Sequence, residues 1–150
     1  MDEERVKKLD SKGRVFIGEV FKPWAEKSEV LITTYVDHLV VLERKDYEAF
    51  VKQVAKENNI DEKKVSIYLG SKTRYLHGWD AHRRIQFTRA EREAIFEDGD
   101  ELSVVPIHGA RDGIETIEIY PKKVYDLIAG EVAEKITNKG GRNEERRRKD

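Results

Sequence analysis

The sequence predicts an α+β fold built from two β-rich units in tandem, each followed by a helix. The segment at 9–17 is echoed at 79–87, since both copies carry Asp-x-x-x-Arg and then a run of β-branched or aromatic residues. The echo continues further along the chain, and each copy runs into a helical pattern. We therefore interpret the chain as two divergent copies of a single unit.

The later parts of the copies correspond less strictly than the opening segments. Residues 29–32 match 101–104, and residues 39–42 match 117–120. The separation between counterparts grows from 70 to 72 to 78 residues along the chain. Small insertions in the turns of the second copy explain this growth, because turns accept insertions at the lowest free-energy cost.

The first unit opens with a strand at 5–9, a tight turn, and a return strand at 14–17. In the turn Asp10 can accept hydrogen bonds from backbone amides, Gly13 can adopt a positive φ, and Arg14 can pair with the Asp10 carboxylate. The equivalent turn of the second unit has Asp80 and Arg84. We expect Asp10 and Asp80 to stabilise the turns. In one interpretation the two ion pairs only lock the turns, and in the other they also present the arginines to a ligand; the two interpretations do not exclude each other.

The rest of the first unit reads as two strands, at 30–34 and 39–43, and an amphipathic helix at 45–57 that stops at Asn58 and Asn59. Trp24 has apolar neighbours and is expected in the core. A connector follows at 61–73 and begins with the polar residues 61–64. Within it residues 65–69 alternate between apolar and polar, which is typical of a half-buried strand.

The second unit repeats this order, with strands expected at 74–76, 84–87, 101–106 and 114–120. Thr88 and Glu91 form a capping box at the start of a short helix. A helix follows Pro121, and Gly140 and Gly141 are expected to end it. The predicted organisation is a first unit at 1–60, a connector at 61–73, a second unit at 74–138 and a disordered basic tail at 139–150.

The segment Leu9-Asp10-Ser11-Lys12-Gly13-Arg14-Val15-x-Ile17 resembles the opening hairpin of the AbrB-like (SpoVT-AbrB) swapped-hairpin transcription factors. The doubled Asp-x-x-x-Arg is similar to the MraZ family, whose members contain two such units. The resemblance implies a pseudo-symmetric, intertwined, β-barrel-like core whose paired hairpins present basic side chains to double-stranded DNA. It also implies a transcriptional regulator.

The charge distribution favours the same partner. The 150 residues carry a formal net charge of only −1. The segment 71–92, however, has six basic and two acidic residues, and the segment 139–150 has six basic and three acidic ones. Positive charge is therefore concentrated in the second hairpin and the tail, as expected for a surface that meets nucleic acid.

Basic side chains in and beside the two turns are the candidate DNA contacts. Arg83 is the strongest single candidate because it occupies the turn tip where the first unit has Gly13. In addition, no carboxylate lies four residues before Arg83, the spacing at which Asp10 precedes Arg14. The alternative is that all of these side chains form an ordinary solvated surface. The full set of candidates is Lys7, Lys8, Lys12, Arg14, Arg74, His82, Arg83 and Arg84.

Other function classes have little support in the sequence. Cysteine is absent, the four histidines have no metal-binding spacing, and no nucleophile elbow or phosphate-binding loop is present. We therefore expect that the protein is not an enzyme and that it has no catalytic residue, metal or cofactor.

No apolar run approaches the length of a membrane span, and the acidic start is unlike a signal peptide, so we expect a cytoplasmic protein without membrane contact. The 39% of charged residues, rich in Glu and Lys, is typical of a thermophile.

Two alternatives remain open. The units could form a non-enzymatic interaction or oligomerisation module, which the acidic balance outside the basic segments allows. RNA binding is a weaker alternative, supported only by Tyr68, Tyr75 and Trp79. Whichever function holds, we expect a homo-oligomer, a dimer or larger, because edge strands and apolar faces need to be covered.

Overall fold

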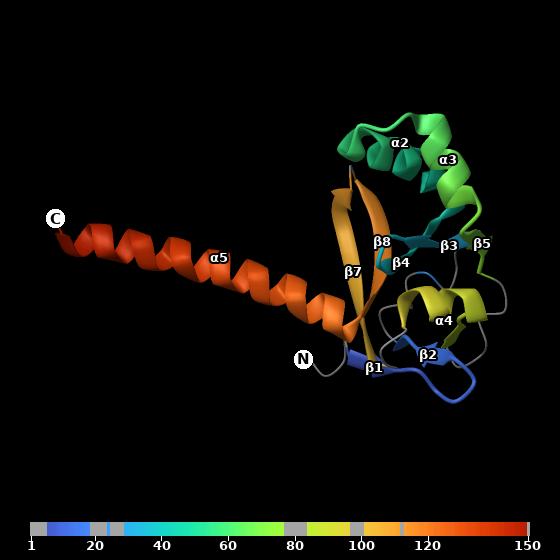
Figure 1. Ribbon diagram of the computed structural model, residues 1–150, viewed down its shortest axis with the longest axis horizontal. Coiled ribbons are helices and arrows are strands. Elements are labelled where there is room, and N and C mark those ends of the chain that lie inside the picture. The colour runs from blue at the N-terminus through green and yellow to red at the C-terminus, as the bar shows by residue number, and fades with distance from the viewer. Residues whose placement is uncertain are drawn as a thin grey trace.

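The computed structural model describes residues 6–18, 24, 29–76, 84–96, 101–111 and 113–149 (Figure 1). Its elements confirm the predicted α+β class. The strands are β1 (Val6–Lys8), β2 (Arg14–Phe16), β3 (Val30–Tyr35), β4 (His38–Glu43), β5 (Thr73–Tyr75), β6 (Arg84–Gln86), β7 (Glu101–Arg111) and β8 (Ile114–Pro121). The helices are the short 3-10 helix η3 (Arg44–Asp46), α2 (Tyr47–Asn58), α3 (Glu62–Gly70), α4 (Arg89–Ile95) and α5 (Lys122–Lys149).

Six strands form one open sheet in the order β1-β7-β8-β4-β3-β5, and β2 pairs with β6 in a separate ribbon, here called the β2/β6 ribbon. The described strands do not close into a barrel, which corrects the barrel-like core implied by the family resemblance. The two edge strands, β1 and β5, are three residues long and pair only with their inner neighbours. Such short edges leave little backbone for closing the sheet.

Two of the antiparallel pairs join residues that are counterparts in the sequence repeat. In the β2/β6 ribbon Val15 lies opposite Ile85, its counterpart 70 residues later. In the sheet Val40 of β4 lies opposite Glu118 of β8, its counterpart 78 residues later. When two equivalent strands pair antiparallel with counterparts face to face, a local two-fold axis passes between those residues. Both pairs therefore have the register of an approximate two-fold symmetry between the two copies.

The first strand of each copy pairs with the other copy. β1 pairs with β7, and β5 pairs with β3, so that Lys7 faces Leu102 and Arg74 faces Ile32. Counted from either edge, the sheet therefore has the same order of equivalent strands, with β1, β7 and β8 at one end matching β5, β3 and β4 at the other. This exchange is consistent with swapped-hairpin units. The exact boundaries between units, connector and tail remain predictions.

Apolar side chains fill two cores on opposite faces of the sheet. On one face α2 and α3 cover the β3/β4 half, and Phe50, Val54 and Leu69 pack with Leu31 and Val40 (Figure 1). Fully burying side chains of this size stabilises the fold by about 1.5–3 kcal/mol each. The other core includes the inward side chains of the β2/β6 ribbon, and Trp24 is buried in it as expected.

The predicted strand at 65–69 is wrong, because this segment lies in helix α3. The alternation of Val65, Ile67 and Leu69 suggested one buried face of a strand. In the structure Val65 and Leu69, four residues apart, are buried, whereas Ile67 is exposed. A spacing of four residues is the helical period, and the contact with α2 selects it over the alternating one.

Helix α5 is longer and more isolated than expected, and it extends away from the sheet (Figure 1). It continues through Gly140 and Gly141 to Lys149, so the structure has helix where a disordered tail was predicted. The Glu, Arg and Lys residues that follow the two glycines are good helix formers and favour continuation. The apolar side chains of its first half are exposed: Leu127, Ile128, Val132 and Ile136.

Candidate nucleic-acid interface

The first turn, between β1 and β2, is held together by Asp10. Its Oδ1 accepts the backbone N–H groups of Lys12 and Arg14, both at 2.9 Å, and its Oδ2 accepts Nε of Arg14 at 2.8 Å. These bonds, chiefly the one from the Arg14 amide, hold the pKa of Asp10 below its ordinary value. The turn-stabilising role expected for Asp10 therefore has a direct structural basis.

Gly13 completes this turn for two reasons. Its φ is +75°, a conformation that residues with a Cβ rarely adopt. In addition, a Cβ at this position would lie 2.8 Å from Nη1 of Arg92, which packs on the turn from helix α4. The glycine therefore lets an arginine from the second copy approach the turn of the first.

The β2/β6 ribbon has one buried and one outward face. Val15 and Ile85 point into the core, each about 1% exposed. The side chains that alternate with them face outward, and they are Arg14 and Phe16 on β2 and Arg84 and Gln86 on β6. Phe16 is 52% exposed, and Nζ of Lys7 lies 5.6 Å from the centre of its ring.

The structure brings several of the predicted DNA contacts to this ribbon and its turn. Arg14 and Arg84 are on its outward face, and Lys12 is exposed in the turn. Lys7 and Lys8 are on β1, which leads into the same turn. Within the described part of the chain, the two Nη groups of Arg14 have no hydrogen-bond partner. Three predicted residues, Asp80, His82 and Arg83, lie outside the described residues.

Arg74 has a different environment. Its Nε and Nη2 donate to the two carboxylate oxygens of Glu91 at 2.9 and 2.8 Å, and Nη2 also donates to the Gln86 carbonyl. Glu91 is only 6% exposed, and its carboxylate also accepts the Thr88 backbone N–H in the predicted capping box. Arg74 thereby ties β5 to β6 and to the start of α4, and its contribution to DNA binding stays a prediction.

Helix α4 adds two arginines that were not among the candidates. Arg92 lies against the first turn, and its Nε is buried without a hydrogen-bond partner among the described residues. Arg89 is largely exposed and pairs with Glu93 at 2.8 Å. Both line a hollow of about 540 Å³ together with Glu93 and Phe96. The basic composition of 71–92 included both arginines, but only the packing of α4 shows that Arg92 reaches the turn at Gly13.

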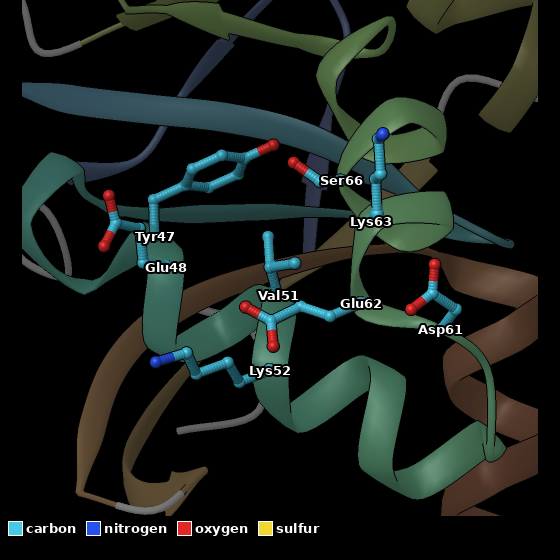
Figure 2. A pocket seen from close by; sticks show the side chains of 8 residues that line it. All are labelled: Tyr47, Glu48, Val51, Lys52, Asp61, Glu62, Lys63 and Ser66. Atoms are coloured by element: carbon cyan, nitrogen blue, oxygen red, sulfur yellow. The ribbon is translucent and has the colours of Figure 1, made fainter.

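A second hollow lies between α2 and α3 (Figure 2), the helices whose core is on the face of the sheet opposite to that of the β2/β6 ribbon. Acidic and basic side chains alternate around it, with Glu48 and Lys52 from α2 and Glu62 and Lys63 from α3. This mixture favours no particular ligand charge. The described residues contain no cluster of possible metal ligands, and none of the described helices is long and apolar enough to cross a membrane.

Comparison with known families agrees with the resemblance found in the sequence. Residues 3–69 match the family model described as "MraZ protein, putative antitoxin-like". The matched segment includes β1, the Asp10 turn, β2, β3, β4 and α2. No curated protein matches the chain. The MraZ-like character is therefore confirmed for the first copy, and the second copy lies beyond the matched segment.

Proposed function

We propose that this chain, MraZ-like over residues 3–69, is a sequence-specific regulator of transcription that binds double-stranded DNA through the β2/β6 ribbon and its turns. A regulatory, DNA-binding role is the coarse function that the family match supports. The sequence preference and the choice of contact surface are inferred from the arrangement of the basic side chains.

The outward face of the ribbon is the observation that carries the proposal. Arg14 and Arg84 occupy equivalent positions about the approximate two-fold axis, and a two-stranded ribbon has the dimensions to enter a major groove. Among the described residues the Arg14 side chain is bonded to Asp10 through Nε alone, and its two Nη groups keep their donors. An arginine in this state can donate two hydrogen bonds to a guanine edge.

The remaining basic groups fit contacts to phosphates, which position a protein on DNA without reading its sequence. Lys8 and Lys12 are exposed beside the first turn, and Arg92 supplies a guanidinium against that turn. Arg83 and His82 are the corresponding candidates in the second turn. Arg74 is the least suited of the predicted set, because Glu91 already engages it.

Selection of bound duplexes from a random pool tests the proposal, followed by fluorescence anisotropy on the selected duplex over a salt series. We expect one sequence to be enriched and its affinity to fall steeply with salt, because bound phosphates release counterions. Arg83→Ala should weaken binding by roughly 1–3 kcal/mol. Recovery of a random pool without any preferred sequence would reject a sequence-specific regulator.

The exposed apolar side of α5 favours a second candidate function, an oligomerisation module. Ile128, Val132 and Ile136 recur every four residues and are 43–66% exposed. A contiguous exposed apolar stripe is typical of an interaction surface. The two functions are compatible, since a homo-oligomer can present several ribbons to one DNA. If the chain forms a homo-oligomer but binds no duplex DNA, only the oligomerisation function remains.

A further inference from the structure

The outward face of the β2/β6 ribbon is symmetric in one pair of residues and asymmetric in the other. Counterparts in the two copies are Arg14 and Arg84, which are identical, and Phe16 and Gln86, which are not. The register places Gln86 directly across from Arg14, and Phe16 directly across from Arg84. Each arginine thus has a different neighbour, one a polar amide and the other an aromatic ring.

Phe16 is held in its exposed position by its surroundings. Nζ of Lys7 lies over one side of the ring at 5.6 Å, a cation–π contact. Gly18 has a φ of +50°, and a Cβ there would lie 3.0 Å from Cε1 of Phe16, so the backbone passes close to the ring edge. The ring of Phe16 therefore lies beside the arginines, whereas Val15 and Ile17 are buried in the core.

The two unlike residues have different partners in a major groove. Glutamine can form two hydrogen bonds to N6 and N7 of adenine, whereas an aromatic side chain can only make apolar contact with the 5-methyl group of thymine. The Gln86 amide is exposed, with Nε2 3.4 Å from the Lys12 carbonyl, a long contact that a base edge could replace.

We infer that the ribbon reads a site with two unequal halves, in which Gln86 contacts an adenine next to Arg14 and Phe16 contacts a thymine methyl next to Arg84. This inference rests on the proposed function, because it concerns the same DNA-binding face. The difference between Phe16 and Gln86 would make the pseudo-symmetric chain bind its DNA site in one orientation only. Phe16 and Gln86 are then specificity-determining residues, and the arginines contribute alike to both halves.

Single-atom changes in the DNA test this without altering the protein. In the selected duplex each thymine is replaced in turn by deoxyuridine, which lacks the methyl group, and each adenine by 7-deazaadenine, which lacks N7. We expect about a fourfold loss of affinity at one thymine, the value of roughly one buried methylene, and about a tenfold loss at one adenine.

Variants then assign each sensitive base to its side chain. With Phe16→Gln the deoxyuridine effect should vanish, and with Gln86→Ala the deazaadenine effect should vanish. The double variant Phe16→Gln, Gln86→Phe should move the methyl-sensitive position to the other half of the site. Tyr68→Gln is the matched control, because Tyr68 is also an exposed aromatic residue but lies on the distant helix α3. Like Phe16 it has a lysine beside its ring, with Nζ of Lys72 5.3 Å from the ring centre.

The outcomes separate the inference from the function beneath it. Absence of any duplex binding by the unmodified chain overturns the proposed function. Specific binding that is indifferent to every deoxyuridine, or a selected site without thymine, overturns the inference alone. Because the deoxyuridine series uses the unaltered protein, a variant that fails to fold does not remove the test. Melting temperatures of all variants identify such a failure.

Discussion

Val40 of β4 lies directly opposite Glu118 of β8, and the two are counterparts in the sequence repeat. Both side chains are fully buried. Glu118 accepts hydrogen bonds from the Thr116 and Tyr120 hydroxyls at 3.0 and 2.9 Å, and its Oε1 lies 3.0 Å from Nε2 of His38. The second copy thus has a hydrogen-bonded carboxyl group at the position where the first has an apolar side chain.

Replacing Glu118 by Ala should destabilise the fold strongly. The change leaves His38 and two hydroxyl groups without their buried acceptor, and breaking such a network costs about 3–5 kcal/mol. Chemical denaturation measures the free energy of unfolding. Glu115→Ala, at an exposed position of the same strand, is the control and should change it by less than about 0.5 kcal/mol. Equal effects for both variants would contradict the importance of this network.

The stability contributed by Asp10 should depend on pH. Because its pKa is lowered in the folded state, the folded chain binds fewer protons here than the unfolded chain. The contribution is therefore complete above the ordinary value of 3.8 and is lost as the pH falls through the lower folded pKa. The melting temperature of Asp10→Asn should lie below that of the unaltered chain at neutral pH, and the two should converge in acid.

Asp61→Asn is the control for the pH experiment, since Asp61 is exposed and makes no capping hydrogen bond at the start of α3. Its melting temperature should follow the unaltered chain across the same pH range. A gap between Asp10→Asn and the unaltered chain that stays constant down to acid pH would mean that the charge of Asp10 is irrelevant.

Arg74→Ala should act on folding before it acts on DNA. It removes the bidentate partner of Glu91, a carboxylate that is 6% exposed, and leaving this charge unpaired should cost about 3 kcal/mol. Arg74→Lys should recover only part of the loss, because an ammonium group cannot form the same pair of bonds. Denaturation curves report both variants. Unchanged stability of Arg74→Ala, combined with lost DNA affinity, would instead make Arg74 a direct contact.

Arg92→Ala should show the opposite pattern. Its guanidinium has no ion-pair partner among the described residues, so stability should change little, while DNA affinity should fall by roughly 1–3 kcal/mol and the salt slope by about one unit. Arg89→Ala is the comparison, because Glu93 partly neutralises Arg89. Anisotropy over a salt series distinguishes them, and a larger effect at Arg89 than at Arg92 would count against the contact at the turn.

Self-association should depend on one side of α5. Ile128→Lys combined with Val132→Lys places charges on the exposed stripe and should shift a homo-oligomer toward the monomer. Leu127→Lys is the matched control, because Leu127 is also exposed but lies about 100° around the helix from Ile128. Light scattering across micromolar concentrations gives the mass. A monomeric unaltered chain would reject the oligomer outright.

Local chemistry explains what the sequence could predict. The Asp10 turn, the capping box at Thr88 and the end of α2 at Asn59 each depend on residues within four positions of one another. Spacing in the sequence shows such relationships directly. The repeat added the long-range part, because counterparts in two similar copies are natural candidates for symmetric pairing.

Most of the missed features depend on contacts that no local spacing records. Arg92 lies against Gly13 although the two are 79 positions apart in the sequence. Glu91 of helix α4 forms an ion pair with Arg74 of β5. The segment 65–69 has a pattern compatible with a strand, and only its packing against α2 makes it helical. A continuous α5 depends on how far a helix can propagate past two glycines, a balance of small terms.

The exchange of first strands has a consequence for the order in which the chain acquires its structure. Val6 finds its partner Ser103 only 97 residues later, whereas β3 and β4 form a hairpin of adjacent strands. Pairing of such distant segments is slow, because the entropy of closing a long loop is lost before any contact between the segments stabilises the structure. During synthesis on the ribosome β1 must therefore wait, unpaired, until most of the second copy has emerged.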